Sequence, residues 1–164
     1  VLEDDVLLTP ALQPVLQGLL QHADRWDMVK LSQVHSGSPQ PYLELAPGHR
    51  LAVMLSRCTG SSAYIVNRKA AQAYVDGLLP MSLPYDHVFD QGWSFGLQVR
   101  LVTPTPCIHD EEIATTITTG GGSRKFAWHR RLSAHAYRLG NELRRVRYGL
   151  AQWRAEKRRS GLST

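Results

Sequence analysis

The apolar and polar positions of the chain follow two periods, and segments of the two kinds alternate. Four short segments rich in β-branched and aliphatic residues predict strands: 26–31, 51–55, 62–66 and 97–102. Apolar positions recur every three or four residues after Thr9 and after Asn67, which are residue types that begin helices. Because strands and helices alternate, the sequence predicts an α/β domain with a mixed sheet.

The first residues place acidic side chains after an apolar pair. Val1 and Leu2 predict the end of a buried strand, and Glu3, Asp4 and Asp5 follow directly. In an open α/β sheet the carboxyl ends of strands line the ligand crevice, and side chains two apart on an extended segment point the same way. Glu3 and Asp5 would then converge as oxygen donors for Mg²⁺ or Mn²⁺, which can hold a nucleotide diphosphate. The alternative is a solvated acidic turn.

The last third of the chain differs in charge from the rest. Residues 1–122 carry 7 basic and 12 acidic side chains, whereas residues 123–164 carry 12 basic and 2 acidic ones. From 132 to 153 apolar residues recur at helical spacing, which predicts a basic amphipathic helix interrupted at Gly140. We therefore divide the chain into a domain over 1–119 and a tail over 120–164. The tail consists of a glycine hinge at 120–122 and the basic helix.

This basic helix has two interpretations. Over 124–159 it would lie on an anionic membrane surface, with leucine and tryptophan inward and arginine toward the phosphates. Alternatively its apolar stripe packs on its own domain or on another copy. Nucleic acid is not an expected partner, because the tail lacks interleaved aromatic residues and a recognisable binding module.

Composition narrows the class of protein. With 164 residues, 43% of them hydrophobic, the chain is long enough for one domain with a sizeable core, and disorder over its whole length is excluded. No apolar run reaches the ~18–20 residues that a membrane-spanning helix needs. Cys58 and Cys107 show no metal-ligand spacing, so we expect reduced thiols.

Five sequence blocks, in this order, resemble glycosyltransferase family 25, which contains bacterial lipopolysaccharide and lipooligosaccharide glycosyltransferases. The blocks are Val1-Leu2-Glu3-Asp4-Asp5-Val6, Asp27-Met28-Val29-Lys30-Leu31, Ser62-Ala63-Tyr64-Ile65-Val66, Lys69-Ala70-Ala71 and Leu83-Pro84-Tyr85-Asp86-His87. The similarity as a whole runs from Val1 to about Ile117. The resemblance implies a Rossmann-like GT-A transferase that inverts the anomeric centre. It would move a sugar, galactose foremost, from a UDP-sugar to a lipopolysaccharide or related glycan.

The resemblance also carries expectations about context. In the family the nucleoside-binding strands precede the acidic motif with which this chain starts. We therefore expect an upstream part of the protein, and little turnover by these 164 residues alone. We expect the protein to be cytoplasmic and to associate peripherally with the inner membrane. The alternative function is a non-catalytic binding module, with a degenerate transferase fold and a tail that binds polyanions or membranes.

Metal and diphosphate binding is the first role that the resemblance assigns. Glu3, Asp4 and Asp5 stand where the family has its Asp-x-Asp-like motif, with Mn²⁺ or Mg²⁺ as the cofactor. His109 lies near a position where the family often has Gln, and it is either a third metal ligand or a plain loop histidine. The following motif is altered to Ala114-Thr115-Thr116-Ile117, a second departure from the family pattern.

Proton transfer is the second role. Asp86 matches the acidic residue of the family's Pro-x-Asp turn and is the candidate base that deprotonates the acceptor hydroxyl. Two alternatives remain, because Asp86 would also suit sugar hydroxyls as a binding residue or serve as a plain helix cap. Asp90, one helical turn further, is a second candidate base.

Overall fold

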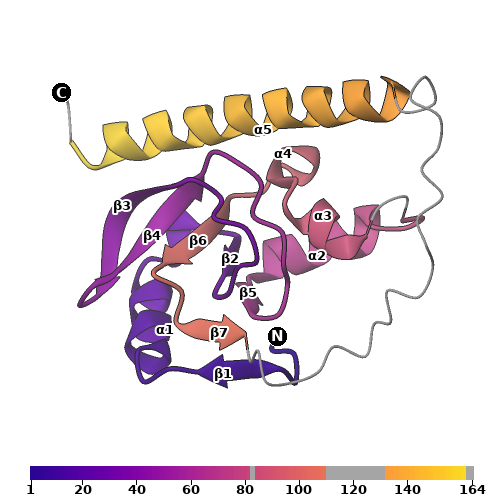
Figure 1. Cartoon of the computed structure of the whole chain (residues 1–164). Helices are drawn as coiled ribbons and strands as arrows, with labels where there is room; N and C mark the ends of the chain where they lie inside the picture. Colours follow the sequence, from indigo (N-terminus) through magenta and orange to yellow (C-terminus); the bar gives the residue numbers. More distant parts are fainter. Residues whose placement is uncertain (82–83, 110–131, 162–164) are drawn as a thin grey trace.

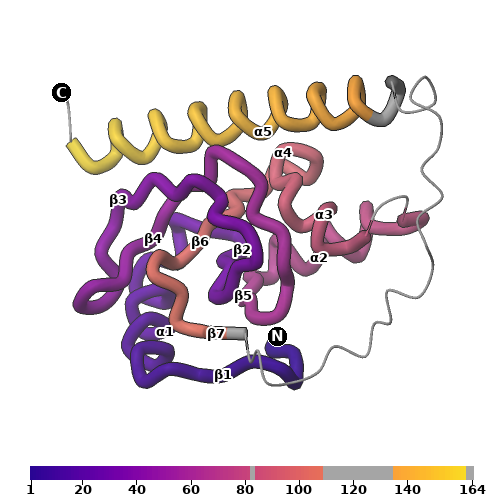
Figure 2. Tube along the Cα trace, viewed as in Figure 1, coloured from indigo at the N-terminus to yellow at the C-terminus, as the bar shows by residue number. Residues whose placement is uncertain are grey.

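The fold combines a five-stranded sheet, a two-stranded sheet and helices around them (Figures 1 and 2). The structure is a computed structural model that describes residues 1–81, 84–109 and 132–161, without the side chains of 109 and 132–134. The strands are β1 (Val6–Leu8), β2 (Met28–Lys30), β3 (Pro39–Ala46), β4 (His49–Met54), β5 (Tyr64–Val66), β6 (Val99–Thr103) and β7 (Cys107–His109). The helices are α1 (Leu12–Gln21), α2 (Arg68–Gly77), α3 (Tyr85–Phe89), α4 (Gly92–Phe95) and α5 (Leu132–Arg159), with a 3₁₀ turn over Ala23–Arg25.

The larger sheet mixes parallel and antiparallel pairs. Its strand order is β3-β4-β6-β2-β5, in which β2 and β6 run parallel and the other neighbours antiparallel. Strands β1 and β7 form a separate antiparallel pair. The prediction of an α/β fold with a mixed sheet is therefore confirmed.

Two hydrophobic clusters cover the two faces of this sheet. Val15 and Leu19 of α1 belong to the cluster that contains Val29 of β2. Met28, the preceding residue of β2, belongs to the second cluster together with residues of α2 and α3. Successive strand residues point to opposite faces, so α1 packs on one face of the sheet and α2 and α3 on the other.

The beginning of the chain differs from the prediction of a buried strand. Val1 and Leu2 are 68% and 50% exposed, and Leu2 makes a single antiparallel bridge, to Ala63. The first strand begins only at Val6, after a turn through the acidic residues. The buried-strand prediction is therefore wrong, because this short apolar pair lies at an open edge of the sheet rather than within it.

The two expected helix starts have different outcomes. Asn67 is the N-cap of α2, and its side chain accepts a hydrogen bond from the Ala70 amide, as predicted. Helix α1, however, has Ala11 as its N-cap. The Thr9 hydroxyl donates to the Pro106 carbonyl at 2.8 Å instead, so Thr9 joins the start of α1 to the segment before β7.

Helix α5 lies across the end of the sheet at which β4 ends and β6 begins (Figure 1). Its 28 residues continue through Gly140, so the predicted interruption is wrong. At Gly149 a Cβ atom would lie 2.5 Å from the Met54 carbonyl oxygen. A glycine is needed there because the helix touches the backbone of β4.

Polar rather than apolar side chains of α5 face the domain. Arg145, Tyr148, Gln152 and Glu156 all bond to residues outside the helix, whereas Leu139, Leu143 and Val146 are 63%, 58% and 40% exposed. Trp153 packs against the first hydrophobic cluster. The helix therefore packs on its own domain, as one of the two interpretations expected, but the expected apolar stripe supplies little of the contact.

Two further expectations concern membranes and the hinge. Within the described residues, no helix is both long and apolar enough to span a membrane. The glycine hinge at 120–122 lies outside the described residues.

Candidate functional site

The acidic motif forms a turn held against the loop before β5. The Glu3 amide donates to the Ser62 carbonyl at 2.7 Å, and the Tyr64 amide donates to the Val1 carbonyl at 3.1 Å. Glu3 and Asp4 are exposed, and Asp5 is half-buried. The three residues therefore lie at the surface beside β5, and not at the carboxyl end of a strand in the sheet.

A hydrogen bond joins this turn to the first residue of α3. The Tyr85 hydroxyl donates to Oε1 of Glu3 at 2.8 Å, across 82 positions of sequence. The Ser61 hydroxyl donates to the Tyr85 oxygen, also at 2.8 Å. Two of the sequence motifs, at 1–6 and 83–87, are thus brought together, and Tyr85 and Ser61 are site residues that sequence reasoning missed.

Tyr85 remains a hydrogen-bond donor at neutral pH. The hydrogen bond from Ser61 lowers its pKa, but burial and the neighbouring Glu3 carboxylate outweigh this and raise the pKa above its ordinary value of 10.0. The neutral phenol is therefore the species that holds the Glu3 carboxylate.

Asp86 lies next to this hydrogen bond, in the first turn of α3. Pro84 occupies the N-cap position, so the interpretation of Asp86 as a plain helix cap is wrong. The carboxylate is half-buried and makes no hydrogen bond or ion pair with any other described residue. Asp86 is therefore available to accept a proton or a hydrogen bond from a ligand.

Asp90, the second candidate base, is part of a buried ionic cluster. It is 5% exposed, and its Oδ2 lies 2.9 Å from Nη2 of Arg145, with the Lys30 amine 3.8 Å from Oδ1. It also accepts from the Cys58 amide at 3.2 Å. A carboxylate engaged by two cations is structural, which makes the prediction of Asp90 as a base wrong.

Lys30 fixes the loop that supports the site. Its side chain is only 1% exposed, and its amine donates to the carbonyls of Cys58 and Gly60, the residues just before Ser61. One indication of this role was visible in the sequence, namely a charged residue between the apolar residues 29 and 31. A lysine buried at such a position needs specific partners.

Asp27, which belongs to another of the sequence blocks, holds β2, α2 and β6 together. Its carboxylate accepts from the Lys69 amine at 2.8 Å, from the Asn67 side chain at 3.0 Å and from the Gln98 amide at 2.8 Å. Burial raises its pKa, but these bonds outweigh burial and leave the pKa below 3.8. The residue therefore has a structural role.

The expected metal ligands are brought together only in part. Strand pairing places His109 opposite Val6, directly after Asp5. The His109 side chain lies outside the described residues, and no three described His, Cys, Asp or Glu side chains are grouped closely enough to hold an ion. Glu3 and Asp5 supply oxygen atoms of the kind that Mn²⁺ and Mg²⁺ prefer.

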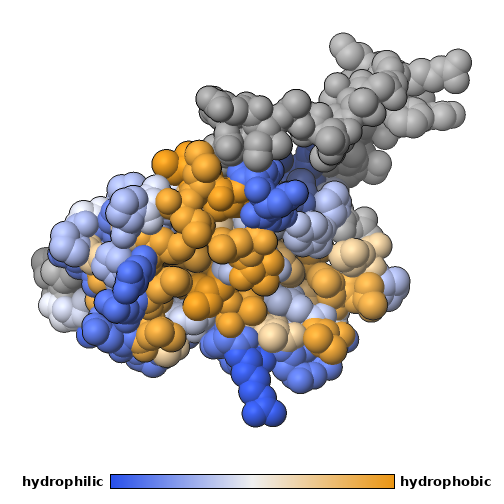
Figure 3. Space-filling view, turned by 90° about the horizontal axis from the view of Figure 1, so that it is seen from below, coloured by the Kyte–Doolittle hydropathy of each residue, from blue (hydrophilic) through white to orange (hydrophobic). Residues whose placement is uncertain are grey.

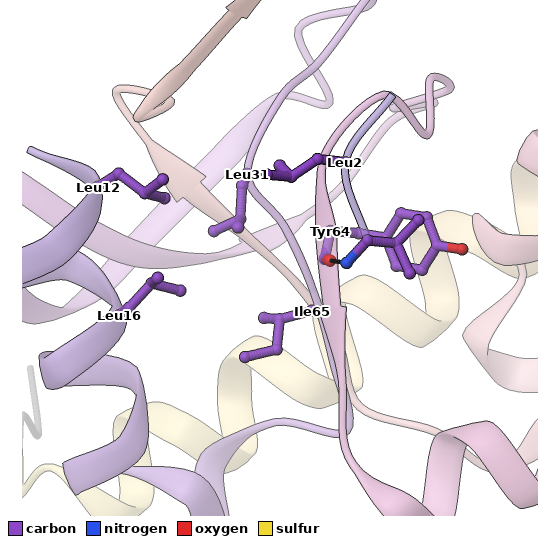
Figure 4. A pocket seen from close by; sticks show the side chains of 7 residues that line it. Leu2, Leu12, Leu16, Leu31, Tyr64 and Ile65 are labelled. Carbon is purple, nitrogen blue, oxygen red and sulfur yellow. Dashed lines mark hydrogen bonds between the residues drawn. The ribbon is translucent and has the colours of Figure 1, made fainter. Parts of the chain in front are cut away.

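A separate hollow beside the N-terminus is apolar. Its volume is about 220 Å³, and Figure 4 shows Leu12 and Leu16 of α1 on one side with Leu31, Tyr64 and Ile65 on the other. Figure 3 shows hydrophobic side chains gathered on the face that carries α1, β1 and β7. Such a lining offers nothing that would bind a diphosphate.

Comparisons with known proteins add no relative. Neither the protein-family models nor the curated proteins nor the solved structures that were searched match this chain.

Proposed function

We propose that this chain belongs to an inverting, metal-dependent GT-A glycosyltransferase that moves a sugar from a UDP-sugar to a lipopolysaccharide or related glycan. The observation that carries the proposal is the 2.8 Å hydrogen bond between Tyr85 and Glu3. It brings the acidic motif and the Pro-Tyr-Asp turn to one place, although 82 positions separate them. Two motifs of the resembled family can act in one active site only if the fold brings them together, as it does here.

Asp86 is the proposed general base. It would take the proton from the acceptor hydroxyl as the oxygen attacks the anomeric carbon, while the bond from that carbon to the diphosphate breaks on the opposite face. Its lack of a partner among the described residues supports this role, because a carboxylate held in an ion pair would be a poorer base.

Glu3 and Asp5, with His109 as the third ligand, are the proposed holders of Mn²⁺ or Mg²⁺. When bound, such an ion supplies positive charge for the departing diphosphate. Tyr85 would keep the Glu3 carboxylate in one orientation through its hydrogen bond.

The test is binding of UDP-galactose to the full-length protein with and without Mn²⁺, measured by calorimetry. We expect binding that requires Mn²⁺ and is lost in Glu3→Gln, which keeps the side-chain shape but removes its charge. Asp76→Asn is the matched control, because Asp76 is exposed on α2 and bonds only to Gln72 among the described residues. Absence of Mn²⁺-dependent binding in the unmodified full-length protein would contradict the proposal.

Transfer to an acceptor by the full-length protein tests Asp86 separately. Asp86→Asn should leave binding of the donor unchanged and lower the transfer rate by about 10²–10⁴-fold, the usual contribution of a general base. An unchanged rate would remove Asp86 from this role.

Peripheral association with a membrane is supported by a separate observation. Leu139, Leu143 and Val146 are exposed at helical spacing on α5, and Arg147 and Arg154 of the same helix are exposed as well. Exposed apolar side chains beside arginines suit the surface of an anionic bilayer. The same observation favours the second candidate function, a non-catalytic module bound at a membrane.

Vesicle sedimentation tests this association. The chain should bind phosphatidylglycerol vesicles but not phosphatidylcholine vesicles, and Leu143→Glu should weaken that binding. Leu20→Glu, at a 65% exposed leucine of α1, is the matched control. Binding to vesicles without any binding of UDP-sugar would favour the non-catalytic module over the transferase.

A further inference from the structure

A polar cleft of about 590 Å³ lies between α3 and the first half of α5. The charged and titratable side chains that line it are Arg57, His87, Tyr137, Arg138, Glu142 and Arg145. Three arginines thus face one carboxylate, so the cleft has an excess of positive charge. An anionic group is the ligand that such a lining favours.

Arg145 lies at the base of the cleft and is 5% exposed. Its Nη2 is 2.9 Å from Asp90 and its Nη1 is 2.5 Å from Glu142, while its guanidinium lies over the Trp93 ring at 5.5 Å. Its buried Nε–H has no partner among the described residues. This Nε–H is closed to solvent, so Arg145 contributes positive charge at the base of the cleft rather than a free donor.

The two arginines nearer the solvent keep free donors. Arg138 is exposed and pairs with no other described residue. Arg57 uses Nη2 in a 2.8 Å hydrogen bond to His35, whose other ring nitrogen is 2.7 Å from the Thr59 hydroxyl. This contact holds Arg57 at the edge of the cleft and leaves most of its guanidinium donors for a ligand.

We propose that this cleft binds a phosphate group carried by a sugar. Arginine guanidinium groups match the geometry of phosphate oxygens, and Arg57 and Arg138, which pair with no described carboxylate, suit a group with two negative charges. Gln91 and Asn141 also line the cleft and offer amide groups to sugar hydroxyls.

The position of the cleft connects it to the candidate base. His87, in the cleft wall, directly follows Asp86 on α3. Identification of the phosphorylated sugar as part of the glycan acceptor rests on the proposed function. The binding of a phosphorylated sugar by the cleft does not depend on the proposed function, and it is tested without nucleotide or metal.

The experiment is calorimetric titration of the whole chain with glucose 6-phosphate. Saturable binding is expected, and Arg57→Gln and Arg138→Gln should each weaken it about tenfold, which corresponds to the loss of one hydrogen bond to a charged group. Neither side chain belongs to the hydrophobic clusters, so both variants should keep the circular dichroism spectrum of the parent chain. Arg154→Gln, an equal charge change on the exposed side of α5, should leave the affinity unchanged.

Three results would overturn the proposal. The first is an absence of saturable binding, or an equal loss of affinity in Arg154→Gln, which would show only a general attraction of anions. The second is binding of inorganic phosphate as tight as that of glucose 6-phosphate, which would remove the sugar from the proposal. The third is binding of phosphatidylglycerol vesicles that depends on Arg57 and Arg138 without binding of the sugar phosphate, which would assign the cleft to a lipid headgroup.

Discussion

Glu156 should be one of the most sensitive positions in the chain. It is 2% exposed, and its two carboxylate oxygens each lie 3.0 Å from an arginine, Arg100 and Arg25. Arg100 is fully buried and also donates to the Tyr42 hydroxyl at 3.0 Å and to Gln152 at 2.9 Å. The change Glu156→Gln removes the carboxylate charge and leaves the Arg100 cation in the core.

The expected loss follows from the burial of the two partners. Removing one member of a buried ion pair costs about 3–5 kcal/mol, because the other charge stays buried without compensation. The pair with Arg25, whose side chain is 17% exposed, adds about 0–1 kcal/mol. Since a domain of this size has a stability of roughly 5–15 kcal/mol, Glu156→Gln should remove about a fifth of it or more.

Urea unfolding followed by circular dichroism at 222 nm measures this loss. Glu44→Gln, the same change at an exposed residue of β3, should alter the free energy of unfolding by less than about 0.5 kcal/mol. The double variant Arg100→Met with Glu156→Met should be close to the parent chain, because apolar replacement of a buried pair is often neutral. A loss below about 1 kcal/mol in Glu156→Gln would refute the reasoning that this carboxylate attaches α5 to the sheet.

Three further changes test other contacts. The pKa of Asp27 is lower in the folded chain than its ordinary value of 3.8, so its contribution to stability is present above pH 3.8 and is lost as the pH falls through the folded-state pKa. In Asp27→Asn the free energy of unfolding should therefore fall less steeply below about pH 4 than in the parent chain. Burial raises the pKa of the Cys58 thiol to about 11, so a thiol reagent at pH 8 should modify it only after unfolding, and rapid reaction in the native state would contradict this. Gly149→Ala should lower the thermal midpoint because its Cβ would meet a backbone oxygen of β4 at 2.5 Å, whereas Gly140→Ala, in open space on the same helix, should raise it.

The sequence predicted the elements whose signal is local. The β4 and β5 segments and the Asn67 cap were correct, because strand periodicity and capping depend on neighbouring residues. Strand β3, by contrast, runs from Pro39 to Ala46 within a stretch rich in serine, proline and glycine, a composition typical of loops. Its prolines are tolerated because β3 is at the edge of the sheet, a position that only the strand order reveals.

The candidate site was predictable where a motif marked it. Glu3 and Asp86 were found from their motifs, whereas Ser61, Tyr85 and Arg145 became site residues only through contacts across the fold. Helical periodicity placed the contact face of α5 on its apolar stripe. The observed face is polar because its partners, such as Asp90 and Arg100, are charges that other elements bury.

The way in which α5 is attached limits how it can bind a membrane. If the helix left the domain, Arg100 would stay in the core without Glu156, and Asp90 would lose Arg145. Each loss leaves a buried charge with fewer partners, at a cost of several kcal/mol that a few exposed leucines would have to exceed. A membrane should therefore meet α5 in place, through Leu139 and Leu143. In that arrangement the polar cleft keeps Arg145 at its base. The proposed sugar-phosphate site and the proposed membrane contact are therefore compatible with each other.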